Sequence, residues 1–435
     1  MSETHARRAG VCLHITSLPG PGGVGTLGER AYWFVDRLCE AGLSLWQVLP
    51  TGPTGYGDSP YQLLSVFAGN PMMIDLPRLE TLGLITRQEL DALPPGVDER
   101  VDFGALHAPR RALLTRAARR FLDDADRDTR TRFDAFCRAH AERWLAGYAE
   151  YAVLKSAHDG QPWYDWPKAL ANRSPAAMAA VRESRADDIA NVKAIQFLFH
   201  EQWSALADYA RQRDVKLIGD VPIYVAHDSA DTWSRRDLLQ FDDNDELAAV
   251  GGVPPDYFSA DGQLWGNPLY DWDAHARTDF RWWRDRLTHA CTLTDLVRID
   301  HFRGFEAYWS VAPDAPTARD GHWVPGPGDA LFDALTAHRP DLPIIAEDLG
   351  LITPPVQALR RKYALPGMAV LQFMVMEDGF HPSHIEEDRV CYTGTHDNDT
   401  TRGWFGEGDE PHDADRRARV LAVTGGTADN VTTQP

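Results

Sequence analysis

The sequence is poor in positive charge and has no long apolar run. Its 44 Lys and Arg residues stand against 64 Asp and Glu residues, which gives a formal net charge of −20 at pH 7. Such a surface repels phosphate backbones and anionic lipid headgroups, so nucleic acid and membranes are poor candidate partners. No apolar segment approaches the roughly 20 residues of a membrane span, and no signal-peptide core follows the first arginines. We therefore expect a cytoplasmic protein, and nothing in the sequence implies an obligate protein partner.

Cysteine is also scarce. The five cysteines are scattered and odd in number, and none forms a C-x-x-C pair. A disulfide framework or a zinc knuckle needs paired and regularly spaced cysteines, so neither is expected. Tryptophan, by contrast, is abundant, with 14 residues. Indole rings stack well on the apolar faces of sugars, although most of these side chains can equally fill the core.

Short apolar runs followed by polar residues recur along the chain and predict strands. They occupy residues 11–20, 43–52, 215–224, 293–302, 343–350, 369–375 and 389–399. Helix-like segments separate most of them, which predicts an α/β fold with parallel strands. Polar residues gather where these strands end, a pattern typical of the active-site face of a (β/α)₈ TIM-type barrel. An open doubly wound sheet is the alternative.

Two long segments interrupt this alternation. Residues 75–190 carry charged helical sequence and are interpreted as an α-helical insertion after the second strand. Residues 227–272 are rich in Gly, Pro, Asp and aromatics, and predict a long loop after the third strand that can act as an active-site lid. The whole chain, 1–435, is thus expected to form a single catalytic barrel domain.

The run LVRIDHFRGF contains the first candidate for chemistry. Arg298 and Asp300 are two residues apart on a predicted strand, so their side chains point to the same face. A neighbouring guanidinium lowers the pKa of a carboxyl and would keep Asp300 ionised, as a nucleophile must be. An ordinary ion pair between the two side chains is an equally reasonable interpretation of this motif alone.

Two further strand ends carry carboxylates. Glu347 follows the apolar run PIIA, where apolar neighbours raise the pKa of a carboxyl and suit it to donate a proton. Asp348 is interpreted instead as a helix cap. GTHDNDT supplies Asp397, together with residues that bind either sugar hydroxyls or, as a weaker alternative, a metal. Asp220 ends the third strand and binds either substrate or its neighbours in the barrel.

Three carboxylates at separate strand ends fit glycoside chemistry. A retaining enzyme needs two carboxyls about 5–5.5 Å apart, one as nucleophile and one as acid and base. A third carboxylate can stabilise an oxocarbenium-like transition state.

Several long motifs occur in an order that resembles the 4-α-glucanotransferase family, also called amylomaltase or disproportionating enzyme (glycoside hydrolase family 77, α-amylase superclass). The resemblance covers residues 10 to 410 approximately. It rests on TSLPGPGGVGTLG (16–28), WQVLPTGPTGYGDSPYQLLSVFAGNP (46–71), GDVPIYVAHDSADTW (219–233), GGVPPDYFSADGQLWGNPLYDW (251–272), LVRIDHFRGF (296–305), AEDLG (346–350) and GTHDNDTTRGWF (394–405).

This resemblance implies transfer of α-1,4-glucan segments between maltooligosaccharides, without a metal or organic cofactor. It implies that Asp300 is the nucleophile, Glu347 the general acid and base, and Asp397 the stabiliser of the transition state. The substrate-binding residues that it implies are Tyr61, Asp220, Tyr257, Trp265, Asn267, Arg298, His301 and His396. For Asn267, a purely local role before Pro268 is the alternative.

The sequence departs from the family pattern after GTHDNDT. Family members continue to another helix and an eighth strand, whereas only seven strands are predicted here, so the eighth strand is expected to be missing. An incomplete barrel would expose two strand edges and put stability and activity in doubt. Three other functions stay open: a plain α-glucan hydrolase, a non-catalytic glucan-binding protein, and, least favoured, a metal-dependent hydrolase built on GTHDNDT.

Overall fold

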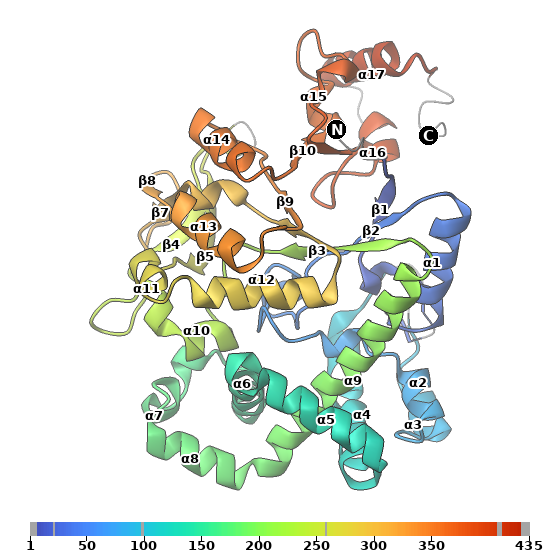
Figure 1. Cartoon of the computed structure of the whole chain (residues 1–435), viewed down its shortest axis with the longest axis vertical. Helices are drawn as coiled ribbons and strands as arrows, with labels where there is room; N and C mark the ends of the chain where they lie inside the picture. Colours follow the sequence, from blue (N-terminus) through green and yellow to red (C-terminus); the bar gives the residue numbers. More distant parts are fainter. Residues whose placement is uncertain (1–6, 21, 97–99, 257–258, 407–410, 428–435) are drawn as a thin grey trace.

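The computed structural model describes residues 7–20, 22–96, 100–256, 259–406 and 411–427. Its central element is a five-stranded parallel sheet (Figure 1). In spatial order its strands are β1 (Gly10–Cys12), β2 (Leu45–Gln47), β3 (Lys216–Val221), β6 (Leu296–Ile299) and β9 (Ile344–Ala346). Spatial order follows chain order, as expected for an α/β fold.

Two more parallel strands extend this series. β10 (Gly367–Val370) pairs with β11 (Arg389–Tyr392). The amide of Ala346 at the end of β9 donates to the carbonyl of Pro366, at 2.8 Å, and joins β10 to the sheet. All seven strands therefore run in the same direction and deliver their carboxyl ends to one face.

Alternation along the strands separates two apolar environments. Leu217, Val297 and Ile344 belong to the large core that the surrounding helices complete. Their chain neighbours Ile218 and Ile345 face a second, smaller cluster with Met368. Because side chains alternate along a strand, residues 220, 298 and 300 share the face of Ile218. We call these seven strands the strand wall, and we call the side that bears the smaller cluster its inner side. The polar residues at the strand ends thus lie on the inner side.

Helices cover the outer side of this wall. The helices between successive strands are α1 (Glu29–Glu40), α9 (Ala186–Arg211), α12 (Arg281–Leu293), α13 (Gly328–His338) and α14 (Pro354–Lys362). In α1 the buried residues Ala31, Val35 and Leu38 recur every three or four positions, which gives one apolar face toward the core. No helix in the described ranges combines the length and apolar content of a membrane span.

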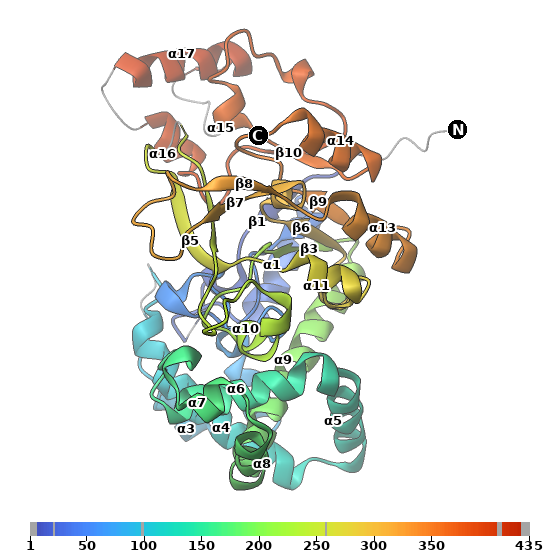
Figure 2. The same ribbon diagram turned by 90° about the vertical axis from the view of Figure 1, so that its left-hand side faces the viewer.

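The region between β2 and β3 is helical and lies at one end of the molecule (Figures 1 and 2). It contains α2 (Leu76–Thr81), α3 (Arg87–Asp91), α4 (Phe103–Asp124), α5 (Arg127–His140), α6 (Ala146–Ala157), α7 (Lys168–Ala171) and α8 (Pro175–Ser184). Side chains cap many of these helices; Thr86 and Glu89, for example, form a capping box at α3. The 26-residue helix α9 returns the chain from this region to the sheet.

A second, antiparallel sheet was not predicted. Its strands, in spatial order, are β5 (Gln263–Pro268), β4 (Val250–Val253), β7 (Ala307–Val311) and β8 (His322–Pro325). Residues 227–272, expected as a loop, thus contain β4 and β5 as well as helix α10 (Ala230–Ser234), and the segment ends where helix α11 (Trp272–Arg277) begins. Glycine hides the strand pattern, because a Cβ on Gly252 would lie 2.4 Å from the carbonyl of Gln263.

The chain ends in a small helical group at the opposite end from α4–α8 (Figures 1 and 2). The predicted strand 369–375 ends early, because residues 371–374 form the short helix α15 (Leu371–Met374). Its Gln372 is buried and donates to the carbonyl of Asp399 at 2.9 Å, which ties α15 to the loop after β11. In the part of the chain described after β11, the elements are α16 (Thr401–Gly406) and α17 (Pro411–Thr424), and no strand occurs there.

Candidate active site

One arginine joins the ends of two neighbouring strands. Arg298 of β6 lies opposite Asp220 of β3 in the register, and its Nη1 donates to both carboxylate oxygens at 2.9 and 2.7 Å. Its Nη2 donates to Oδ1 of Asp300 at 2.9 Å. The side chains of Arg298 and Asp220 are buried, whereas 30% of the Asp300 side chain is exposed. Asp300 is therefore the member of this group that a ligand can reach.

The electrostatics of Asp300 differ from the sequence prediction. We expected Arg298 to lower the pKa of Asp300, but the pKa is raised well above its ordinary value. Burial is the main cause, and the negative charges of Glu347, Asp220 and Asp397 add to it. Arg298 opposes the shift but divides its charge between two carboxylates. Asp300 and Glu347 consequently titrate as an interacting pair.

Glu347 follows β9 directly, and backbone amides hold its buried carboxyl. Oε2 accepts a hydrogen bond from the amide of His301 at 2.7 Å, and Oε1 accepts one from the amide of Leu349 at 2.8 Å. Burial raises the pKa of Glu347, while Arg298 and the two amides oppose the shift. The first of these bonds ties Glu347 to the residue that follows Asp300, so the two carboxyls share one backbone support.

His301 has a left-handed backbone conformation, with φ of 53°. This conformation is rare outside glycine and costs free energy, so it marks a constrained position. The amide of the same residue donates to Glu347. The imidazole is buried, its Nε2 has no hydrogen-bond partner among the residues that the structure describes, and burial lowers its pKa to about 3. The ring of Trp265, from β5, packs edge-on against it at 4.8 Å, so the antiparallel sheet also reaches the site.

The loops after β2 and β11 meet over Asp220. The Tyr61 hydroxyl donates to Oδ2 of Asp220 at 2.7 Å and lies 2.8 Å from Nε2 of His396. The Tyr61 and His396 rings stack with their centroids 5.3 Å apart. Nε2 of His396 also lies 3.3 Å from Oδ1 of Asp397, whose side chain is 74% exposed. Asp397 therefore projects into solvent beside the buried group.

The alternative interpretation of GTHDNDT as a metal site finds no geometric support. Asn398 Oδ1 accepts from the amide of Thr395 at 2.9 Å and from its hydroxyl at 3.0 Å, so this side chain shapes the loop. Among the residues that the structure describes, no group of three or more His, Cys, Asp or Glu side chains is arranged to hold a metal ion.

Two predicted substrate contacts stand apart. Asn267 is buried and its Nδ2 donates to the carbonyl of Val225 at 2.8 Å, which ties β5 to the chain after β3. This long-range bond is a structural contact and differs from the local role before Pro268 that was the alternative for Asn267. Tyr257 lies outside the described residues.

Sequence reasoning missed the role of Asp348. It does not cap a helix, because α14 has Thr353 at its N-cap position. Instead, its buried carboxylate accepts from the amide of Met368 and from Arg389. Sequence reasoning also missed Tyr392, whose hydroxyl donates to Oε1 of Gln47 at 2.6 Å between β11 and β2. No spacing in the sequence signals either contact, because each partner comes from another strand.

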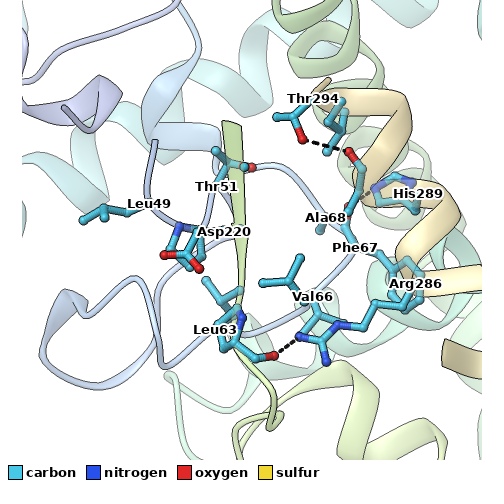
Figure 3. Close-up of a pocket in the computed structure, with 17 residues that line it drawn as sticks. Leu49, Thr51, Leu63, Val66, Phe67, Ala68, Asp220, Arg286, His289 and Thr294 are labelled. Atoms are coloured by element: carbon cyan, nitrogen blue, oxygen red, sulfur yellow. Dashed lines mark hydrogen bonds between the residues drawn. The ribbon is translucent and has the colours of Figure 1, made fainter. Parts of the chain in front are cut away.

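A cavity also opens between the ends of β2 and β3 and helix α12 (Figure 3). Arg286, His289 and Thr294 line its helix side, and Nε2 of His289 lies 2.7 Å from the carbonyl of Phe67. Asp220 lines this cavity, but Asp300, Glu347 and Asp397 do not. The cavity is therefore a packing space within the wall, and the strand-end carboxylates form the candidate site.

Comparison with known proteins places the chain beside one family of enzymes. A family model described as 4-alpha-glucanotransferase matches residues 13–434. The chain is 47% identical to the 4-alpha-glucanotransferase of Thermus thermophilus, over 96% of this chain and 84% of the relative. It is 45% identical to the 4-alpha-glucanotransferase of Synechocystis sp., over 93% and 81% respectively.

Solved structures agree as well. The amylomaltase of Streptococcus agalactiae in complex with acarbose superposes with a TM-score of 0.91 at 36% identity, over 99% of this chain and 86% of that one. The amylomaltase of Corynebacterium glutamicum, at 16% identity and a TM-score of 0.75, covers 98% of this chain and 63% of its own and shares the fold.

Proposed function

The chain belongs to the 4-alpha-glucanotransferase family, and on that basis we propose that it transfers α-1,4-glucan segments between maltooligosaccharides through a covalent ester on Asp300. One observation carries this proposal. Arg298 binds the partly exposed carboxylate of Asp300, while Glu347 accepts a hydrogen bond from the backbone amide of the next residue, His301. A carboxylate pair supported in this way suits a retaining mechanism, in which both groups flank one glycosidic bond.

The proposed reaction has two steps. Glu347 donates its proton to the glycosidic oxygen while Asp300 attacks the anomeric carbon, which releases one sugar chain and forms a glycosyl ester. In the second step, Glu347 takes the proton of an acceptor 4-hydroxyl, whose oxygen displaces Asp300 from the anomeric carbon. Two inversions restore the original configuration. Burial raises the pKa of Glu347, which is the direction that a proton donor needs.

Asp397 and the surrounding rings complete the proposed site. The exposed Asp397 carboxylate contributes to the field around Asp300 and is suited to stabilise positive charge on the sugar ring. We assign substrate contacts to Tyr61, His396 and His301. Tyr61 and His396 contact each other beside Asp220 and Asp397, and the backbone amide of His301 binds Glu347. Trp265, beside His301, would help a sugar acceptor to dock in place of water, together with the 251–268 segment. Tyr257 of this segment keeps its proposed substrate role.

We further propose that the strand wall is the frame of a (β/α)₈-type barrel with its active site at the carboxyl ends. Seven parallel strands in chain order, helices on their outer side and strand-end polar residues on their inner side support this. The helical region 75–190 and the segment 227–272 are then insertions in one catalytic domain. Among the described residues, no eighth parallel strand joins this series.

Incubation with maltotriose tests the function. Transfer should convert maltotriose into glucose and a ladder of longer maltooligosaccharides, and Asp300→Asn should lower the rate by at least about 10³-fold. A folded preparation that forms only hydrolysis products would point to an α-glucan hydrolase. Binding without turnover, unchanged in Asp300→Asn, would point to a glucan-binding protein.

A further inference from the structure

A buried charged cluster lies directly beside Glu347. Asp348, the next residue, has a side chain that is 1% exposed. Its Oδ1 accepts from the amide of Met368 at 2.8 Å, and Nη1 of Arg389 donates to both of its oxygens at 2.9 and 2.8 Å. The carboxylate that follows the proposed acid and base is therefore fixed from two neighbouring strands.

A second arginine closes the cluster from the outside. Arg360 of α14 has a fully buried side chain, with Nε 3.3 Å from Oδ2 of Asp348. Its Nη1 donates to the carbonyl of Leu365 and to Oδ2 of Asp388, both at 2.8 Å. The Arg360–Asp348–Arg389 cluster thus connects α14 and the end of β9 to β11. The bond from the Met368 amide to Asp348 connects β10 to the same cluster.

The cluster is closely packed where β10 passes it at Gly367. A Cβ on Gly367 would lie 2.7 Å from each carboxylate oxygen of Asp348 and 2.8 Å from Nη1 of Arg389. Taking charges out of water is costly, and a buried ion pair often stabilises a protein no more than apolar residues of similar volume. Stability alone therefore gives a weak reason for two buried arginines around Asp348, and their geometry suggests a second role.

The cluster is connected to the remaining site residues. Nη1 of Arg389 donates to the carbonyl of Met368 at 2.8 Å, and Sδ of Met368 accepts from Nε of Arg298 at 3.4 Å. Arg298 in turn binds Asp300. Arg389 is also the first residue of β11, which leads to His396 and Asp397. A displacement of Asp348 would therefore move the supports of all three proposed catalytic carboxylates.

From these contacts we propose that Asp348, clamped by Arg389 and Arg360, is a positioning residue that holds Glu347 in register with Asp300 for glucan transfer. This proposal rests on the proposed function. The role has two parts. The clamp fixes the backbone at residues 347 and 348, and the negative charge of Asp348 favours the protonated form of Glu347, whose pKa it raises.

Two substitutions separate these parts. Asp348→Asn removes the negative charge, so the pKa of Glu347 should fall and the basic limb of the kcat/KM profile should move to lower pH. Arg389→Lys keeps the charge but cannot hold both oxygens and the Met368 carbonyl in the same geometry. It should lower kcat on maltotriose about tenfold or more, with little change in KM and no movement of the limb.

A matched control changes a buried, ion-paired carboxylate in the helical region between β2 and β3. Glu150 of α6 has a side chain that is 6% exposed and binds Arg182 at 2.6 Å. Glu150→Gln should lower the thermal midpoint of unfolding but leave both kcat and the pH profile unchanged. A purely structural role of Asp348 would produce this same result.

The outcomes are distinguishable. If the wild type disproportionates maltotriose while folded Asp348→Asn keeps its kcat and basic limb, the positioning role is wrong and the proposed function stands. If Asp348→Asn does not fold, Arg389→Lys decides, because an unchanged kcat in that folded variant overturns the role. If the wild type forms no transfer products, the proposed function fails, and the positioning role fails with it.

Discussion

Tyr61 and His396 stand 335 residues apart in the chain, yet the Tyr61 hydroxyl lies 2.8 Å from Nε2 of His396 and their rings stack. The two residues belong to the loops after β2 and β11. Tyr392 and Gln47 form a second bond between the same two strands. Side chains from the site loops thus join parts of the strand wall that lie far apart in strand order.

Removing the Tyr61 hydroxyl should weaken activity more than stability. Tyr61→Phe keeps the stacked ring but loses the bonds to Asp220 and His396, while Asp220 keeps Arg298. These bonds hold Asp220 and His396 beside the carboxylates, so their loss should misplace the substrate contacts and lower kcat/KM for maltotriose about tenfold or more. The thermal midpoint should change little. An equal loss in both measurements would mean that Tyr61 serves only to hold the loops together.

Glu347→Gln should lose activity on maltooligosaccharides. It should still form the glycosyl ester from a substrate whose leaving group needs no proton. α-Glucosyl fluoride has a leaving group that needs no proton, so Asp300 alone can form the ester. Rapid-quench measurement of fluoride should show a normal first turnover in Glu347→Gln and none in Asp300→Asn. Loss of the first turnover in both variants would contradict the separate roles assigned to the two carboxyls.

Asp300 should make stability fall with rising pH. A carboxyl whose pKa is raised by folding stabilises the folded state fully below its unfolded pKa, and this contribution is lost as pH rises through the folded pKa. For Asp300 this window runs from 3.8 to about 8. Asp300→Asn cannot ionise, so its urea midpoint should equal that of the wild type near the lower limit and exceed it near the upper limit. A difference that is constant across this range would refute the raised pKa.

A cluster of three histidines should have the opposite effect and make the free energy of unfolding fall as the pH falls. His140, His200 and His289 lie together, with ring centroids about 6 Å apart, and burial lowers the pKa of His140 to about 4 and that of His289 to about 3. Stability is then present above the unfolded pKa of 6.5 and is lost as pH falls through the folded values.

His289→Gln tests this directly. The Gln amide can still donate to the carbonyl of Phe67, but it does not bind a proton in this range. Below pH 6.5 the urea midpoint of the variant should fall less steeply than that of the wild type. Parallel curves for the two proteins would assign the acid sensitivity to other groups.

The sequence predicted the parts of the fold that local pattern determines. Short apolar runs with polar ends located the parallel strands, and the two-residue spacing correctly placed Arg298 beside Asp300. The antiparallel sheet was not predicted because β4 contains Gly251 and Gly252. Glycines give no alternation of apolar and polar side chains, and here they allow neighbouring groups to approach the backbone closely. The predicted end of β10 was wrong because residues 371–374 form a helical turn, in which Gln372 donates a hydrogen bond to the distant carbonyl of Asp399.

Interactions across strands were beyond sequence reasoning. The contacts of Asp348 with Arg389 and of Asp220 with Arg298 depend on register, which no single segment encodes. The predicted direction of the Asp300 pKa was also wrong, because burial raises this pKa, Arg298 is shared with Asp220, and three other carboxylates add to the increase. A pairwise argument from neighbouring residues could not include these long-range charges.

The pairing of strands in chain order bears on how the protein is made. Each new parallel strand finds its partner already present as the chain leaves the ribosome, so we expect the wall to grow during synthesis. At about 5–20 residues per second, His396 emerges on the order of tens of seconds after Tyr61. Protease protection of ribosome-bound chains should therefore appear before any transfer activity. Catalytic activity should begin only after β11 and the loop that carries His396 and Asp397 have emerged and joined the strands made earlier.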